Sequence, residues 1–234
     1  MIEAVTAAVP IPLRTAVDAS LAWYDALCAL HGVPCGIRDD VWAAYAPPPP
    51  LHSAAKSVEP TVRPDRVLAA VEGLEQGGIA DSFGSFDLTT EGFELLFEAQ
   101  WIHRPASGDP SEVPAGWSIV RSAAQLTQWT SHHDTQQVLL PGLLDRSSFV
   151  VLGKRGDHDS ADLTAGVVLH LGTAAVSVSN LWADEPDQAW AEVVSAAGAL
   201  FPGRSLVGYE YGADLERAQA VGFAAIGPQR VWAR

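Results

Sequence analysis

The feature that most constrains this chain is a strand, a short helical segment, a Gly-Phe pair and a closing strand, which occur twice in that order. In the first occurrence, residues 79–82 form the predicted strand and Gly92-Phe93 opens the closing strand. In the second, residues 205–209 form the strand and Gly222-Phe223 opens the closing strand. A glycine at such a place ends a helix in the left-handed conformation, and the aromatic residue begins the next strand. The repetition predicts two related halves.

Apolar periodicity predicts the order of elements in the second half. Alternating or continuous apolar runs indicate strands, and apolar residues spaced three and four apart indicate helices. We expect strands at residues 117–120, 149–153, 165–171, 176–182, 205–209 and 223–232, and helices at residues 123–131, 189–200 and 213–221. Ser122 is a favoured N-cap for the first of these helices. The second half therefore has a strand and a helix, three antiparallel strands, and two helix-strand steps.

The first half ends in the same way but is less regular. We expect helices at residues 13–28 and 67–74, strands at residues 41–45, 51–58, 79–82 and 93–101, and a helical turn at residues 87–91. No clear strand precedes the opening helix. The first half is thus predicted to be the more degraded copy.

A boundary is expected between residues 105 and 116, where helix and strand breakers accumulate and apolar periodicity stops. This divides the chain into residues 1–112 and residues 117–234. The predicted fold class is α/β (α+β), with a mixed, mainly antiparallel sheet flanked by helices in each half.

Charge and composition limit the partners of the chain. It carries 28 acidic and 14 basic residues, a formal charge of −14, without a run of Lys and Arg that would follow a phosphate backbone, so we expect no nucleic-acid partner. The N-terminus lacks the basic segment of a secretory signal, and no apolar run reaches membrane length. We expect a cytoplasmic protein, away from the membrane, in which Cys28 and Cys35 are reduced.

A pair of adjacent histidines, His132 and His133, invites a metal interpretation. Neighbouring residues on a helix point about 100° apart, so the two rings do not easily share one ion. We predict no metal site.

The order of elements over residues 117–234, with residues 205–209 before a helix that ends at Gly222-Phe223, resembles the GNAT superfamily of N-acetyltransferases. Residues 79–104 resemble a second, eroded copy, so that the whole is similar in layout to tandem GNAT proteins with one working and one structural copy. The resemblance implies an acyl-CoA donor, acetyl-CoA or another, and an amine acceptor.

The resemblance also implies where the donor binds. In such proteins the pantetheine arm pairs with a strand that separates from its neighbour, and the pyrophosphate binds a glycine-rich turn at a helix N-terminus. The equivalent residues here are Val178, Ser179, Asn180 and Leu181 on the strand and Gln188 at the end of the turn. The turn itself, residues 183–188, has three acids, a proline and no glycine, which disfavours a pyrophosphate.

The tyrosine that often serves as the general acid in this superfamily is missing, because Ala218 and Leu88 stand at the two positions four residues before the Gly-Phe glycines. Tyr209, Glu210 and Tyr211 lie at the end of the preceding strand, where ligands of open α/β sheets approach. Glu210 is the candidate base, and the two tyrosines are the candidate acids.

Two functions stay open. The first is an N-acyltransferase that moves an acyl group from acyl-CoA to a small-molecule amine or to a protein N-terminus or lysine. The alternative is a degenerate GNAT-fold module that binds a ligand or a protein without acyl transfer. Such a module could act as a homo-oligomer.

Overall fold

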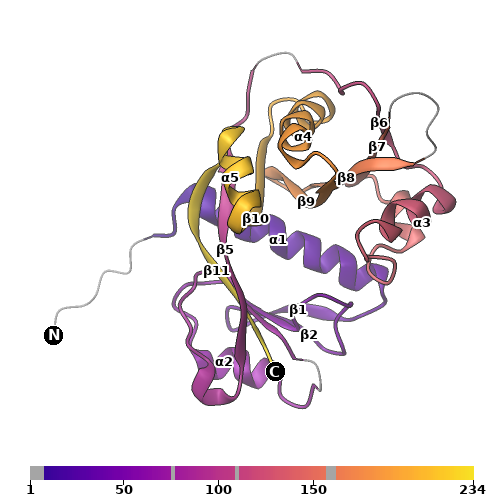
Figure 1. Cartoon of the computed structure of the whole chain (residues 1–234). Coiled ribbons are helices and arrows are strands. Elements are labelled where there is room, and N and C mark those ends of the chain that lie inside the picture. Colours follow the sequence, from indigo (N-terminus) through magenta and orange to yellow (C-terminus); the bar gives the residue numbers. More distant parts are fainter. Residues whose placement is uncertain (1–7, 75–76, 109–110, 157–161) are drawn as a thin grey trace.

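The computed structural model describes residues 8–74, 77–108, 111–156 and 162–234, and its central feature is one mixed sheet with helices on both faces (Figure 1). Eleven strands form the sheet in the order β1-β2-β3-β4-β11-β5-β10-β9-β8-β7-β6. The α/β (α+β) class predicted from the sequence is confirmed. The strands assigned to the two halves join in a single sheet.

The strands of this sheet are β1 (Cys35–Arg38), β2 (Val41–Ala44), β3 (Ala55–Ser57), β4 (Ile79–Asp81), β5 (Glu94–Arg104), β6 (Trp117–Ile119), β7 (Phe149–Arg155), β8 (Leu163–Leu171), β9 (Ala175–Ala183), β10 (Ser205–Glu210) and β11 (Ala224–Ala233). The helices are α1 (Ile11–Leu30), α2 (Pro64–Ala70), α3 (Ala123–Ser131), α4 (Pro186–Leu200) and α5 (Gly212–Ala220), with 3-10 turns η1 (Thr89–Glu91) and η2 (Pro141–Asp145).

Local signals explain several of these elements. Ser122 Oγ accepts a hydrogen bond from the Gln125 N–H, and the Gln125 side-chain oxygen accepts one from the Ser122 N–H, so the predicted N-cap of α3 is a complete capping box. Gly92 and Gly222 have φ of 78° and 91°, the left-handed backbone expected of the two Gly-Phe pairs. The expected hairpin of β7 and β8 is present and continues antiparallel into β9.

The predictions were wrong near the start of the chain. The strand expected at residues 51–58 is only Ala55–Ser57, because Leu51 lies in the left-handed region, with φ of 62°, which is incompatible with a strand. The hairpin partner β1 was not predicted. Its signal was present in Asp39 and Asp40, which both have positive φ and join β1 to β2 in a two-residue turn.

The strands cross the boundary predicted around residues 105–116. β5, from before the boundary, lies between β10 and β11, from after it, and pairs antiparallel with both. β11 in turn pairs antiparallel with β4. Each long closing strand therefore lies beside strands from the other part of the chain.

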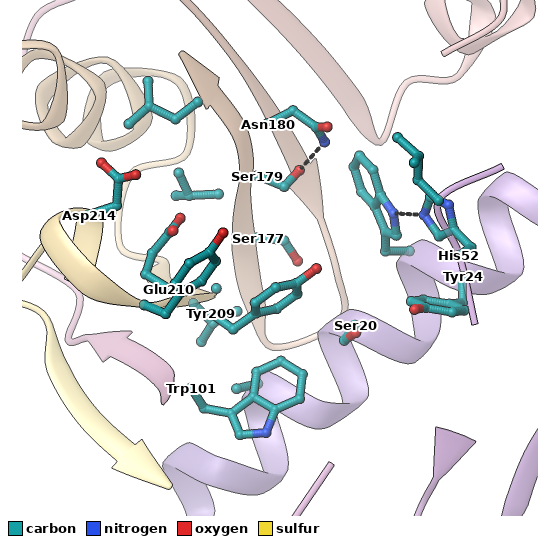
Figure 2. A pocket seen from close by; sticks show the side chains of 18 of the residues that line it. Ser20, Tyr24, His52, Trp101, Ser177, Ser179, Asn180, Tyr209, Glu210 and Asp214 are labelled. Atoms are coloured by element: carbon teal, nitrogen blue, oxygen red, sulfur yellow. Dashed lines mark hydrogen bonds between the residues drawn. The ribbon is translucent and has the colours of Figure 1, made fainter. Parts of the chain in front are cut away.

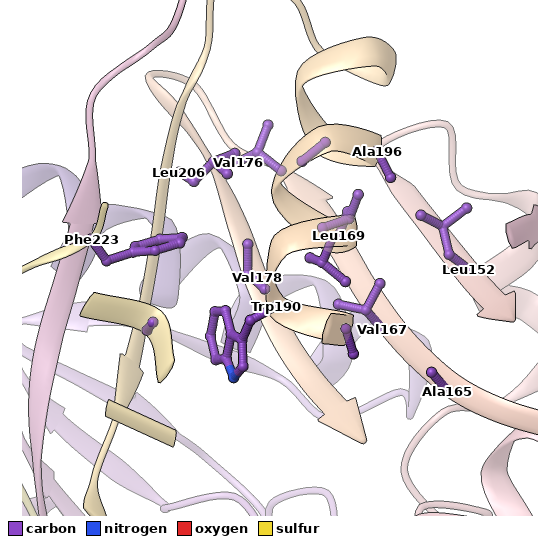
Figure 3. Close-up of a cluster of buried hydrophobic side chains, with 14 of the residues drawn as sticks. Leu152, Ala165, Val167, Leu169, Val176, Val178, Trp190, Ala196, Leu206 and Phe223 are labelled. Carbon is purple, nitrogen blue, oxygen red and sulfur yellow. The ribbon is translucent and has the colours of Figure 1, made fainter. Parts of the chain in front are cut away.

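The face of the sheet under α4 and α5 holds the first hydrophobic core (Figure 3). Trp190 of α4 packs there with Val176 and Val178 of β9, and Phe223 meets the Trp190 ring edge-on at 5.7 Å. This core anchors α4 and α5 beside the ends of β9 and β10.

Helix α1 crosses the opposite face of the sheet (Figure 1). Its apolar side, including Ala16 and Val17, packs with Ala175 of β9, Val207 of β10 and Trp101 of β5. The middle of the sheet thus lies between α1 on one face and α4 with α5 on the other. Within the described ranges, no helix has both the length and the apolar character needed to cross a membrane.

Candidate functional site

The two parallel strands in the middle of the sheet separate from each other. β9 and β10 pair over only three residues each, 175–177 and 205–207. Both strands are fully described, and they continue to Ala183 and Glu210 without further pairing between them. A cavity of about 360 Å³ opens at this point and is lined by residues 177–181 and 207–210. The separation leaves a slot through the sheet.

A β-bulge shapes the β9 wall of the slot. The register between β8 and β9 shifts between the pairs Gly166↔Trp182 and Val168↔Ser179. Asn180 lies within the bulge with φ of 51°, and its side chain donates a hydrogen bond to Ser179 Oγ at 3.2 Å. Bulges of this kind redirect the backbone of a strand next to a site. The four β9 residues predicted from the resemblance, 178–181, all line the cavity.

Gly208 forms the narrow end of the slot. A Cβ atom at this position would lie 2.9 Å from the carbonyl oxygen of Val178, which is closer than packed atoms tolerate. The glycine therefore lets β10 pass the β9 backbone closely before the two strands part.

The cavity has two sides (Figure 2), which follow from the alternation of side chains along β10. Glu210 lies with Asp214 of α5 on one side, which we call the α5 side. Tyr209 points to the other side, the α1 side, together with Trp101, Ser20 and Tyr24. The three residues predicted to be catalytic, Glu210, Tyr209 and Tyr211, all line the cavity.

The fold brings the pKa of Glu210 close to neutral pH. Burial, assisted by the nearby Asp214 carboxylate, raises the pKa of Glu210 to about 8. A carboxyl group that titrates close to neutral pH can accept or release a proton under physiological conditions. Tyr209 behaves differently, because desolvation of its hydroxyl raises its pKa above the ordinary tyrosine value and keeps the hydroxyl protonated, although 40% of the residue's surface stays exposed.

His52 lines the α1 side but both of its ring nitrogens are engaged. Nε2 accepts a hydrogen bond from the Trp23 indole at 3.1 Å (Figure 2), so Nδ1 carries the proton and donates to the Pro50 carbonyl oxygen at 2.9 Å. Burial lowers the pKa of the ring, which stays neutral. His52 is therefore a fixed part of the wall.

Two hydroxyl groups on the cavity wall lack a partner. Ser177 Oγ and Thr135 Oγ1 are buried, and neither has a hydrogen-bond partner among the described residues. Leaving a buried hydroxyl unpaired costs about 1–3 kcal/mol. A ligand with a polar group at this place would satisfy them.

The start of α4 lacks the features of a pyrophosphate site. Glu185 is its N-cap residue and makes no side-chain cap, and Pro186 is its first residue. Arg217 of α5 lies near this end, but it is paired with Asp187 at 2.7 Å and with Asp214 at 3.0 Å. Gln188, predicted to bind the donor, donates instead to Glu192 at 2.7 Å and lies outside the cavity lining.

Sequence reasoning did not find the residues of the α1 side. Ser20, Trp23 and Tyr24 of α1, His52, and Trp101 of β5 line the cavity but come from the first half of the chain. The helical periodicity of α1 identified its buried face without indicating which strands it crosses. His133, considered above only as a metal ligand, also lines the cavity, and His132 stacks on Trp182 at 4.7 Å.

Comparison with solved structures identifies this fold. A GCN5-related N-acetyltransferase from Kribbella flavida is 14% identical with a TM-score of 0.64, over 97% of this chain and 96% of that one. A GCN5-related N-acetyltransferase-like protein from Streptococcus suis is 12% identical with a TM-score of 0.54, over 95% and 98% of the two chains.

A more distant structure has a ligand. Saccharomyces cerevisiae N-myristoyltransferase with bound myristoyl-CoA is 9% identical with a TM-score of 0.50, over 86% of this chain and 61% of that one. No family model and no curated protein sequence matches the chain. The chain thus has the fold of the GNAT acetyltransferases, as expected from the order of its elements.

Proposed function

We propose that this protein is an N-acyltransferase that moves an acyl group from a pantetheine thioester, such as acyl-CoA, to a small-molecule amine. The observation that carries the proposal is the separation of β9 from β10 after three paired residues, with a cavity and a titratable carboxyl group at the point of separation. The shared fold of known N-acetyltransferases supports it.

The slot suits an extended thioester arm. The backbone of residues 178–181 has no partner in β10, so its N–H and C=O groups are available on that edge. An arm with amide groups would add to β9 in the manner of another strand. Backbone N–H groups at the bulge around Asn180 would stabilise the negative charge that develops on the thioester oxygen during attack.

Glu210 would serve as the base. The amine nitrogen forms a bond to the thioester carbonyl carbon, the C–S bond breaks, and the thiolate leaves and takes up a proton from water to become the free thiol. The Glu210 carboxylate accepts the proton that the nitrogen loses. Because its pKa is about 8, the rate rises with pH up to that value.

The nucleotide end of acyl-CoA fits less well than its thioester arm. The turn before α4 presents Asp184, Glu185 and Asp187, and Arg217 is already paired there. Each pair of like charges about 6 Å apart repels with an energy of roughly 0.7–3 kcal/mol. We infer that the pyrophosphate contributes little to binding, and that pantetheine thioesters without the nucleotide are used nearly as well.

The same acidic turn favours a second candidate, a module that binds an amine without transferring an acyl group. The two candidates separate in one assay. Purified protein is incubated with acetyl-CoA or with acetyl-pantetheine and an amine mixture, and both the free thiol and the acylated amine are measured. Amine-dependent release of thiol from both donors supports acyl transfer. No release from either donor at millimolar concentration excludes it and leaves the binding module.

A further inference from the structure

A row of aromatic rings begins in the wall of the α1 side of the cavity and extends beyond it to Phe97, which does not line the cavity. The Trp101 ring meets Tyr209 edge-on at 5.7 Å between centroids. Tyr209 and Tyr211 each stack on Phe97, at 6.3 Å and 5.7 Å, with planes within 22° of parallel. We call Trp101, Tyr209, Phe97 and Tyr211 the aromatic row. It leads from the buried Trp101 outward to the surface.

The outer rings of the row are open to a ligand. Tyr209 is 40% exposed and Tyr211 is 59% exposed, although both stack on a neighbouring ring. Flat apolar surface that continues from a cavity wall is suited to a flat apolar ligand, which gains both burial and ring contacts there.

The charge on the cavity wall is of one sign. Among the described residues that line the cavity none is Lys or Arg, and Glu210 and Asp214 are the acidic ones. The buried Lys56 lies behind the wall, 4.9 Å from the Tyr24 ring and 5.2 Å from the Trp101 ring, and burial lowers its pKa to about 7. Arg217 lies outside the lining and is already paired with Asp214 at 3.0 Å, so a ligand carboxylate or phosphate would meet acidic groups without a Lys or Arg side chain among the described lining residues to bind it.

We propose that the acceptor is a primary amine that carries an aromatic or similarly flat apolar group and has no carboxylate beside the amine. The amine is an acceptor only if the proposed acyl transfer takes place, and in that respect the inference rests on the proposed function. Binding of the amine does not depend on transfer. The amine lies in the slot at Glu210, and the apolar group lies along the aromatic row.

Calorimetric titration of the whole chain without an acyl donor tests the binding. Four probes differ in one feature at a time: 2-phenylethylamine, butylamine without the ring, phenylalanine with an added carboxylate, and phenylalaninamide with a neutral group in its place. We expect 2-phenylethylamine and phenylalaninamide to bind alike. Butylamine and phenylalanine should each bind about 10-fold more weakly, for want of the ring and because of the carboxylate.

Two pairs of variants locate the site. Tyr211→Ala should weaken 2-phenylethylamine about 5-fold or more, whereas Tyr45→Ala, which removes an equally exposed tyrosine away from the cavity, should not change its affinity. Asp214→Asn should reduce the difference in binding affinity, here called the gap, between phenylalanine and phenylalaninamide. Asp187→Asn should leave the gap unchanged, because Asp187 also pairs with Arg217 but does not line the cavity.

The outcomes separate this inference from the proposed function. Selective binding of 2-phenylethylamine without its acylation supports the amine class and contradicts acyl transfer. Acylation of butylamine or of protein lysines as fast as of 2-phenylethylamine supports transfer and overturns the amine class. Equal affinity for all four probes, or an equal effect of Tyr45→Ala and Tyr211→Ala, also overturns the inference.

Discussion

The sheet contains two parallel strand pairs, and one is closed where the other is open. β3 and β4 pair in parallel, as β9 and β10 do. Beyond β3 and β4 the side chains bridge the strands: the Ser82 N–H donates to Ser57 Oγ at 2.8 Å, and Ser82 Oγ donates to the Ser57 carbonyl oxygen at 2.7 Å. Beyond β9 and β10 lies the cavity.

Asp81 completes the closure of the first pair. It is fully buried, and its carboxyl group accepts hydrogen bonds from the Phe86 N–H at 2.7 Å and the Phe83 N–H at 3.2 Å. The same parallel strand arrangement can therefore support either a structural core or a ligand site. A structural core forms where side chains bridge the ends of the two strands. A ligand site forms where the strand ends leave a slot open.

The order of strands is symmetrical about the contact between β5 and β11. Reading outward, β11 is followed by the parallel pair β4 and β3, and β5 is followed by the parallel pair β10 and β9. We propose, on this symmetry and on the two Gly-Phe pairs, that the halves arose by duplication and exchanged their closing strands. The closed pair would then be the structural copy and the open pair the ligand-binding copy.

The largest effect is expected from opening the closed pair. Asp81→Ala removes the acceptor of one buried and one partly buried N–H group, so the free energy of unfolding should fall by about 4 kcal/mol. Asp214→Ala beside the open pair should cost less than about 1 kcal/mol, because its side chain is 55% exposed. Urea denaturation measures both. Equal losses would mean that the two pairs do not differ in their structural role.

The next effect concerns the chemistry of the open pair. Glu210→Gln should lower kcat for acyl transfer about 100-fold and abolish the rise of the rate with pH up to about 8. The folded protein favours the protonated carboxyl, so the wild type loses stability as the pH rises from about 4.5 to 8, and the variant should not. A variant with an unchanged pH-rate profile would remove Glu210 from the proposed mechanism.

A smaller effect is expected at Lys56, the buried amine of the closed pair. Its Nζ has no hydrogen-bond partner among the described residues, and burial lowers its pKa to about 7. Between pH 7 and 10.5 the unfolded chain binds this proton more readily, so stability rises with pH. Lys56→Met should remove most of that dependence on pH. It should also raise the free energy of unfolding by about 2 kcal/mol at pH 7. Thermal unfolding across this pH range checks it, and a loss of stability at pH 7 would contradict it.

Local features of the fold were readable from the sequence, and features that depend on strand crossing were not. Ser122 and Gly222 act within a few residues of themselves, so their neighbours alone indicate a helix start and a helix end. Trp101 reaches the cavity only because β5 crosses into the second half of the sheet beside β10. Its strand was predicted from alternation, but alternation does not indicate the partner of a strand.

The same distinction holds for the site. Tyr209 and Glu210 were expected at the cavity because ligands approach the ends of parallel strands, and they line it. The raised pKa of Glu210 was not predictable, because it arises from burial and from Asp214, four residues away on the next helix. Gln188 was chosen by its place in the resemblance, and its pairing with Glu192 was not foreseen.

The central claim is that the slot between β9 and β10 takes the thioester arm. Hydrogen exchange of backbone amides, measured with and without acetyl-pantetheine, tests it most directly because the two strand pairs report side by side. We predict slower exchange at residues 178–181 and 208–210 on binding, with residues 55–57 and 79–82 unchanged. Unchanged exchange at residues 178–181 would contradict binding of the arm in the slot. Equal slowing at both strand pairs would also contradict it.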